Sequence, residues 1–142
     1  RVDELIGDVA RIARDTFPKN IEFVTTVDPH VPPIVGDHTQ FHQVLVNLCV
    51  NARDAMSDGG TLTLSAYSVG HYVVMCVDDT GSGIAPALID KIFDPFFTTK
   101  DAGKGTGLGL STSQTIVRSH GGDIALDVSS MGGLRAVMRV PL

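Results

Sequence analysis

Apolar residues recur along the chain with two different spacings, of which the helical one comes first. Over 2–17 they stand three or four positions apart, which places them on one face of a helix, and a proline then ends the pattern. A similar stripe over 41–56 follows Asp37, a good helix N-cap with Gln40 at the capping-box distance. A third helix is expected over 108–120, before two glycines that can end it. We therefore predict three longer helices.

Between these helices the apolar residues alternate with polar ones or form short runs, as in β-strands. The expected strands cover 21–27, 61–67, 72–77, 124–128 and 136–140. A turn at 68–70 joins the second and third strands into an antiparallel hairpin. Because strands cluster in the sequence rather than alternate with helices, we expect an α/β (α+β) fold. It is a two-layer α/β sandwich, with a mixed, mainly antiparallel sheet and helices on one face.

Length and hydrophobic content limit the number of domains. A chain of 142 residues with 43% hydrophobic content can form one compact core and is too short for two ordinary domains. We expect residues 1–142 to be a single domain. Because the sequence starts at Arg1, without Met and inside an amphipathic pattern, we also expect it to be a fragment of a longer protein.

Charge and cysteine content narrow the classes of partner. The net charge is −5 and Lys and Arg form no run, which argues against nucleic acid as a partner. Without an apolar stretch of about 18 residues, no membrane contact by this domain is expected, and we expect it to be cytoplasmic even if the full-length protein is membrane-anchored. Cys49 and Cys76 lie in apolar segments without a CxxC spacing, which predicts buried reduced thiols.

The second predicted helix carries polar residues that share one face. Asn47, Asn51 and Asp54 follow one another at steps of four and three, away from the apolar stripe. A solvated helix face is the simpler interpretation. However, Asn is a weaker helix former than Lys or Glu, and its amide oxygen suits Mg²⁺ that also keeps waters and phosphate oxygens.

Two glycine-rich segments follow. The first places Asp79 directly after a strand and before Gly81, Gly83 and Ile84, so a carboxylate lies beside a backbone that a ligand can approach closely. Alone, this spacing also describes ordinary turns. The second segment runs from Gly103 to Gly109 and leads into a helix; its residues include Lys104, Gly105, Thr106, Gly107, Leu108 and Gly109.

The second glycine segment suits an anion. Backbone N–H groups and the positive end of the following helix favour phosphates. It does not match a P-loop, because Lys104 is followed by Gly105, nor a dinucleotide motif, because Leu108 and Leu110 replace the third glycine. A flexible linker is the alternative, although linkers seldom run into a helix with leucines placed to pack.

Three phenylalanines lie between the glycine segments, after a short helical stretch expected around 86–93. For Phe93 a place in the core is the preferred interpretation. Phe96 and Phe97, which follow a proline, can anchor a mobile lid over a ligand. Lys100 and Lys104 then supply positive charge to its phosphates.

Taken together and in this order, these segments resemble the N, G1, F and G2 boxes of histidine kinases. The matching residues are Asn47-x-x-x-Asn51-Ala52, Asp79-x-Gly81-x-Gly83, Phe93-Asp-Pro-Phe96-Phe97-Thr-Thr-Lys100 and Gly105-Thr-Gly-Leu-Gly109. The resemblance covers essentially the whole chain and is greatest to sensor kinases of the nitrogen-regulation type.

The resemblance implies a Bergerat-type ATP site. Asp79 would accept a hydrogen bond from the adenine amine, Asn51 would ligate Mg²⁺ and Asn47 would support it. The segment 105–109 would hold the phosphates under a lid formed by 96–104. Many histidine kinases of another subtype have Lys where this chain has Asp54, which puts a phosphate contact from that position in doubt.

The same resemblance bears on the reaction and on partners. Gyrase-like, mismatch-repair and heat-shock ATPases have a Glu where this chain has Asn47, and Asn cannot act as a general base, which favours transfer over hydrolysis. No histidine of the chain has the His-Glu/Asp-x-x-x-Pro setting of a phosphoacceptor. The expected partners are therefore a phosphoacceptor and dimerisation helical hairpin of the same kinase and a downstream response-regulator receiver domain. An anti-sigma-type serine kinase and a nucleotide-sensing module without catalysis are the alternatives.

Overall fold

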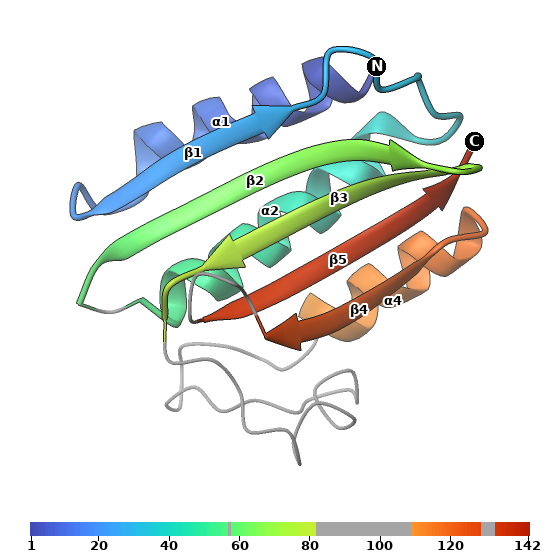
Figure 1. Ribbon diagram of the computed structural model, residues 1–142. Coiled ribbons are helices and arrows are strands. Elements are labelled where there is room, and N and C mark those ends of the chain that lie inside the picture. The colour runs from blue at the N-terminus through green and yellow to red at the C-terminus, as the bar shows by residue number, and fades with distance from the viewer. Residues whose placement is uncertain (57, 82–108, 129–132) are drawn as a thin grey trace.

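The computed structural model describes residues 1–56, 58–81, 109–128 and 133–142 (Figure 1). The expected short helix at 86–93 and the expected lid lie outside these residues. The helices and strands, in chain order, are α1 (Val2–Thr16), β1 (Ile21–Val27), α2 (His38–Asp54), β2 (Gly60–Val69), β3 (Tyr72–Asp79), α4 (Gly109–Ser119), β4 (Asp123–Val128) and β5 (Leu134–Pro141).

The strands form one mixed sheet in the order β1-β2-β3-β5-β4. Strands β1 and β2 are parallel, and the other neighbouring pairs are antiparallel. Figure 1 shows α1, α2 and α4 together on one face of this sheet. The predicted two-layer architecture is confirmed.

The core lies between the helices and this face. On β3, Val73, Met75 and Val77 alternate toward the helices and are almost fully buried. They share one hydrophobic cluster with Val44 and Leu45 of α2. This alternation leaves the even-numbered residues of β3 on the face that carries no helix in the described part of the chain.

Helix α2 begins as the sequence predicts and ends slightly earlier. The Asp37 side chain accepts a hydrogen bond from the Gln40 N–H at 3.2 Å, so it is the N-cap. The helix ends at Asp54, whereas the apolar stripe had suggested Met56 as its last apolar residue. Met56 is nevertheless buried, with 3% of its surface exposed, because its side chain packs in the hydrophobic core cluster.

The hairpin turn lies further along the chain than expected. Val69 pairs with Tyr72, so the turn consists of Gly70 and His71 rather than 68–70. Gly70 has a φ of 58°, a conformation that glycine adopts without steric cost and that suits a two-residue hairpin loop.

Two predictions made from composition can also be compared with the structure. Cys49 and Cys76 are both free and buried, as predicted. Within the described ranges, no helix is long and apolar enough to cross a membrane.

Candidate functional site

A buried carboxylate, that of Asp79, lies at the end of β3. Alternation along the strand directs it to the helix-bearing face of the sheet, and only 2% of its surface is exposed. Its Oδ1 accepts hydrogen bonds from the N–H groups of Gly81 at 2.8 Å and Leu134 at 3.2 Å. These two donors hold the carboxylate in one orientation. No donor from the described residues is placed on Oδ2.

Burial changes the electrostatics of this carboxyl group. Desolvation raises the pKa of Asp79, and the two backbone donors only partly oppose the rise. The neighbouring Asp78 points to the opposite face of the sheet. There its Oδ1 accepts a hydrogen bond from the Nε of Arg135 at 2.7 Å. That hydrogen bond raises the pKa of Arg135. The two adjacent aspartates therefore differ, because among the described residues a cation is paired with Asp78 and none with Asp79.

Glycines allow the backbone to approach Asp79 closely. A Cβ on Gly133 would collide with the backbone and carboxylate oxygens of Asp79, and a Cβ on Gly81 would collide with the carbonyl oxygen of Ala55. Ala55 is the C-cap of α2. The ends of α2, β3 and the start of β5 thus meet around one buried carboxylate.

The polar residues of α2 contribute a second part of the candidate site. Asn47 is half-buried, and its Nδ2 donates to the Ser113 Oγ of α4 at 3.4 Å. Ser113 is fully buried, so Asn47 lies between two helices rather than on a solvated face. Asn51 is also half-buried, one turn further toward Asp79. The Asp54 Oδ1 accepts a hydrogen bond from the Nη2 of Arg53 at 3.2 Å.

Only part of the predicted site lies in the described chain. Asn47, Asn51, Asp54, Asp79 and Gly81 all lie along α2 or at the end of β3 next to it, and Gly109 is the first residue of α4. The other predicted site residues lie outside the described residues: Gly83, Ile84, Phe93, Phe96, Lys100, Lys104, Gly105, Thr106, Gly107 and Leu108.

Three residues near the site were not identified from the sequence. Ser113 is the partner of Asn47, and the N–H of Leu134 orients Asp79. Thr80 accepts from the Thr61 N–H at 3.1 Å through its Oγ1, which stabilises the chain directly after Asp79. The glycine pair before Leu134 was a signal of close backbone approach, whereas a single sequence contains no signal for Ser113 or Thr80.

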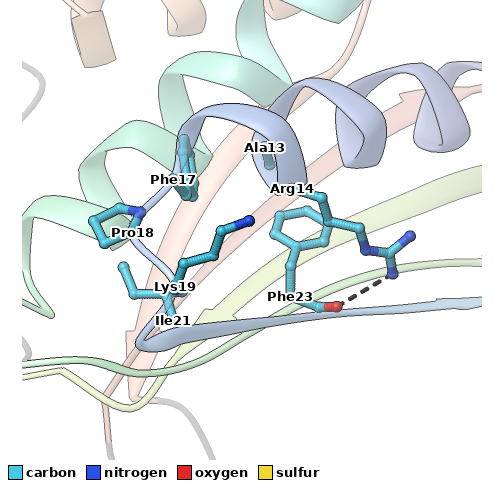
Figure 2. Close-up of a pocket in the computed structure, with 7 residues that line it drawn as sticks. All are labelled: Ala13, Arg14, Phe17, Pro18, Lys19, Ile21 and Phe23. Atoms are coloured by element: carbon cyan, nitrogen blue, oxygen red, sulfur yellow. Dashed lines mark hydrogen bonds between the residues drawn. The ribbon is translucent and has the colours of Figure 1, made fainter.

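A small pocket lies elsewhere, between the end of α1 and the start of β1. It has a volume of about 120 Å³ and contains none of the predicted site residues. Figure 2 shows Phe17 and Phe23 on its walls and Arg14 donating from Nη2 to the Phe23 carbonyl oxygen, a distance of 3.2 Å. The Arg14 guanidinium also lies 5.6 Å from the centre of the Phe23 ring. The Arg14 guanidinium is therefore already bound to Phe23, another residue that lines the pocket.

Comparison of the sequence with known proteins identifies the family of this chain. Residues 36–142 match the family described as histidine kinase-, DNA gyrase B- and HSP90-like ATPase. This range contains α2, the end of β3 and α4.

Curated relatives include sensor kinases. The chain is 40% identical over 139 residues to the sensor kinase CckA of Brucella abortus (strain 2308), a match that covers 87% of this chain and 15% of that protein. It is 34% identical over 141 residues to the sensory histidine kinase/phosphatase NtrB of Azospirillum brasilense, covering 89% of this chain and 35% of that protein. The chain therefore spans well under half the length of these relatives.

Solved structures share the fold. The catalytic domain of histidine kinase ThkA in a nucleotide-free form has a TM-score of 0.87 and 34% identity, covering 99% of this chain and 93% of that chain. ThkA in complex with the response regulator protein TrrA has a TM-score of 0.84 and 31% identity, covering 99% of this chain and 40% of the ThkA chain.

Proposed function

Because this chain belongs to the family of histidine kinase-, DNA gyrase B- and HSP90-like ATPases, we propose that residues 1–142 form one catalytic domain that binds Mg-ATP. It is the ATP-binding domain of a two-component sensor histidine kinase. In the whole protein, it transfers the γ-phosphoryl group to a histidine on a separate dimerisation and phosphoacceptor hairpin.

The buried Asp79 carboxylate is the observation that carries this proposal. Its Oδ1 is fixed by two backbone donors, and alternation along β3 places the carboxylate on the helix-bearing face of the sheet. An exocyclic amine on a flat ring is a suitable donor for such a carboxylate, which accepts only. Adenine has that amine, whereas guanine has a carbonyl at the same place. Asp79 thus selects adenine over guanine nucleotides.

The residues of α2 then hold the phosphate end of the nucleotide. The Asn51 amide oxygen is a neutral ligand suited to Mg²⁺, and no cluster of three or more His, Cys, Asp or Glu occurs among the described residues to bind a metal by itself. Asn51 would hold the ion jointly with the phosphates. When bound, Mg²⁺ neutralises charge that develops during phosphoryl transfer. Asn47, oriented by Ser113, supports this arrangement from the preceding turn.

The remaining predicted residues complete the proposed site. Residues 105–109, of which Gly109 begins α4, hold the phosphates, Lys100 and Lys104 supply positive charge to them, and Asp54 borders the site at the end of α2. Gly83, Ile84, Phe93 and Phe96 border the adenine and the lid. Their roles rest on the order of the motifs in the sequence, and each can be tested by substitution.

Asn47 also favours phosphoryl transfer over hydrolysis. An amide cannot remove a proton from water, so this position supplies no general base for hydrolysis. The acceptor histidine comes from a helical hairpin of the same kinase, and a response-regulator receiver domain acts downstream. Support for the second partner comes from ThkA, a similar protein that occurs in complex with a response regulator.

Radiolabelled ATP provides the test. The chain alone should bind ATP without labelling itself, and it should label a separately produced cognate hairpin in trans. A hairpin whose histidine is changed to Gln is the control and should stay unlabelled. The product should survive alkali and be lost in acid, as expected for phosphohistidine. Strong labelling of the chain alone, or acid-stable label on the hairpin, would contradict the proposal and favour a serine kinase.

A further inference from the structure

The C-terminal end of α4 is tied to the start of α2 through the ring of His120. Helix α4 ends with the Gly122 N–H bonded to the Val117 carbonyl and the Gly121 N–H bonded to the Arg118 carbonyl, each at 3.0 Å. His120 occupies the cap position inside these two bonds. Its ring lies 4.4 Å from the ring of Phe41, in the first turn of α2.

Both ring nitrogens of His120 have partners whose hydrogen-bonding roles are fixed. The Asp37 N–H faces Nε2 at 3.3 Å, and a backbone N–H can only donate. The Ile116 carbonyl oxygen faces Nδ1 at 2.9 Å, and a carbonyl can only accept. The Ile116 contact requires a proton on Nδ1, and the Asp37 contact requires an Nε2 without a proton. Together they require a neutral ring with its proton on Nδ1. A protonated ring has no acceptor left for Asp37.

The backbone around the ring leaves room for this contact. A Cβ on Gly36 would collide with the Phe41 ring and would lie 2.7 Å from the His120 Cδ2. Glycine directly before Asp37 is therefore what allows the imidazole to reach the Asp37 N–H. The Asp37 carboxylate is turned away, because its Oδ1 caps the Gln40 N–H.

A second tie joins the same two helices. The Asn47 amide donates to Ser113 about two turns closer to the start of α4. Core packing already holds α4 against α2, and two contacts separated along both helices restrain the rotation of α4 more than one contact alone. Loss of the His120 contact should therefore change the direction of α4 at its N-terminal end, which is Gly109, the last of the proposed phosphate-binding residues.

We propose that His120, as a neutral imidazole protonated on Nδ1, is a positioning residue that sets α4 against α2 and thereby aligns the two halves of the nucleotide site. This inference rests on the proposed function, because α2 carries the proposed metal-binding residue and α4 begins at Gly109, the last of the proposed phosphate-binding residues. His120 itself lies at the opposite end of α4 from the proposed phosphate site and touches no reacting group.

The ring tautomer gives a test that needs no nucleotide. In the ¹⁵N-labelled chain, long-range proton–nitrogen correlation spectra should show His120 with a pyrrole-type Nδ1 and a pyridine-type Nε2. Exposed His71, at the turn between β2 and β3, is the internal comparison within the same spectrum. A proton on Nε2 of His120 in the neutral ring would overturn the proposal, whatever the chain binds.

Substitutions test the positioning role. His120→Phe keeps a ring against Phe41 but loses both hydrogen bonds, and it should weaken Mg-ADP binding by about 3- to 10-fold. His120→Gln has a carbonyl oxygen near the place of Nε2 and should stay within about 2-fold of the unmodified chain. His71→Phe and His71→Gln should change nothing. All affinities are measured where circular dichroism shows each variant fully folded.

The outcomes separate this inference from the proposed function. Failure of the unmodified chain to bind Mg-ADP would contradict the proposed function, while the tautomer would still be decided by the spectra. Normal binding by the unmodified chain, with His120→Phe binding equally well or His120→Gln as weakly as His120→Phe, would overturn the positioning role. If His120→Phe does not fold, Gly36→Ala is used instead, because the added methyl group blocks the approach of the His120 ring to Asp37. The same loss of Mg-ADP affinity, about 3- to 10-fold, is expected.

Discussion

At the scale of the single residue, Asp79 combines the proposed role in adenine binding with a cost to stability. Because burial raises its pKa, the charged form is less favourable in the folded chain than in the unfolded chain. The associated contribution to the unfolding free energy is complete below the ordinary pKa of 3.8 and is lost as the pH rises through the folded value. At neutral pH the carboxylate therefore destabilises the nucleotide-free chain.

Asp79→Asn should separate these two effects. Its amide oxygen can still accept from Gly81 and Leu134, so the nucleotide-free variant should be at least as stable as the unmodified chain at pH 7, and the advantage should shrink toward pH 4. The same variant should bind ADP about 10- to 150-fold more weakly, because a hydrogen bond to a charged group contributes about 1.5–3 kcal/mol. Urea unfolding at several pH values and calorimetry would measure both. Lower stability at pH 7 with unchanged ADP affinity would contradict both assignments.

Residue types in the sequence were enough to select Asp79, Asn47 and Asn51 as candidate site residues, but not to identify the residues that contact them. A carboxylate at a strand end and amides on one helix face are visible in a single sequence. By contrast, the contacts of Ser113 and Leu134 depend on how α4 packs on α2 and on where β5 begins beside β3. Such contacts join positions 66 and 55 residues apart and are set by tertiary packing rather than by local pattern.

At the scale of the element, two glycines in the described chain have opposite consequences. Gly7 lies in the middle of α1 with nothing within 4 Å of an added Cβ. Gly122 follows α4, and a Cβ there would collide with the Arg139 carbonyl oxygen of β5.

Alanine at each position tests this contrast. Gly7→Ala should raise the unfolding free energy by about 0.5–1 kcal/mol, because glycine weakens a helix interior. Gly122→Ala should lower it by about 1–3 kcal/mol, because β5 must shift to admit the methyl group. Each variant is the control for the other in parallel urea titrations. Equal effects of the two substitutions would mean that the turn after α4 does not meet β5 at Gly122 as described.

The periodicity of the sequence predicted the type of each described element better than its ends. Residues 21–27 were predicted as a strand with the observed bounds, because a proline and a polar connector limit it. The end of α2 was misjudged, since Met56 is buried without being helical. The hairpin turn was misplaced as well, because burial and pairing, rather than helical or strand periodicity, decide where those segments stop.

At the scale of the whole molecule, the helices of the described residues all lie on one face of the sheet, and a cysteine lies on each side of β3. Cys49 is in α2, inside the layer between helices and sheet, and burial raises its pKa to about 12. Cys76 is on the opposite face of β3, where burial also raises the pKa of its thiol. Because the thiolate is the reactive form, neither residue reacts readily in the folded state.

This arrangement makes each thiol a reporter of a different opening event. With a disulfide reagent at pH 8, the single-thiol variant Cys76→Ala should react only when α2 separates from the sheet, and Mg-ADP should slow that reaction strongly. Cys49→Ala, which retains Cys76, should be slowed much less. Equal slowing of the two, or reaction of Cys49 at the rate of a free thiol, would contradict this. The reaction time of Cys49 then measures how long α2 stays packed on the sheet, and that of Cys76 measures how long the opposite face of β3 stays protected. Nucleotide should lengthen mainly the first of these times.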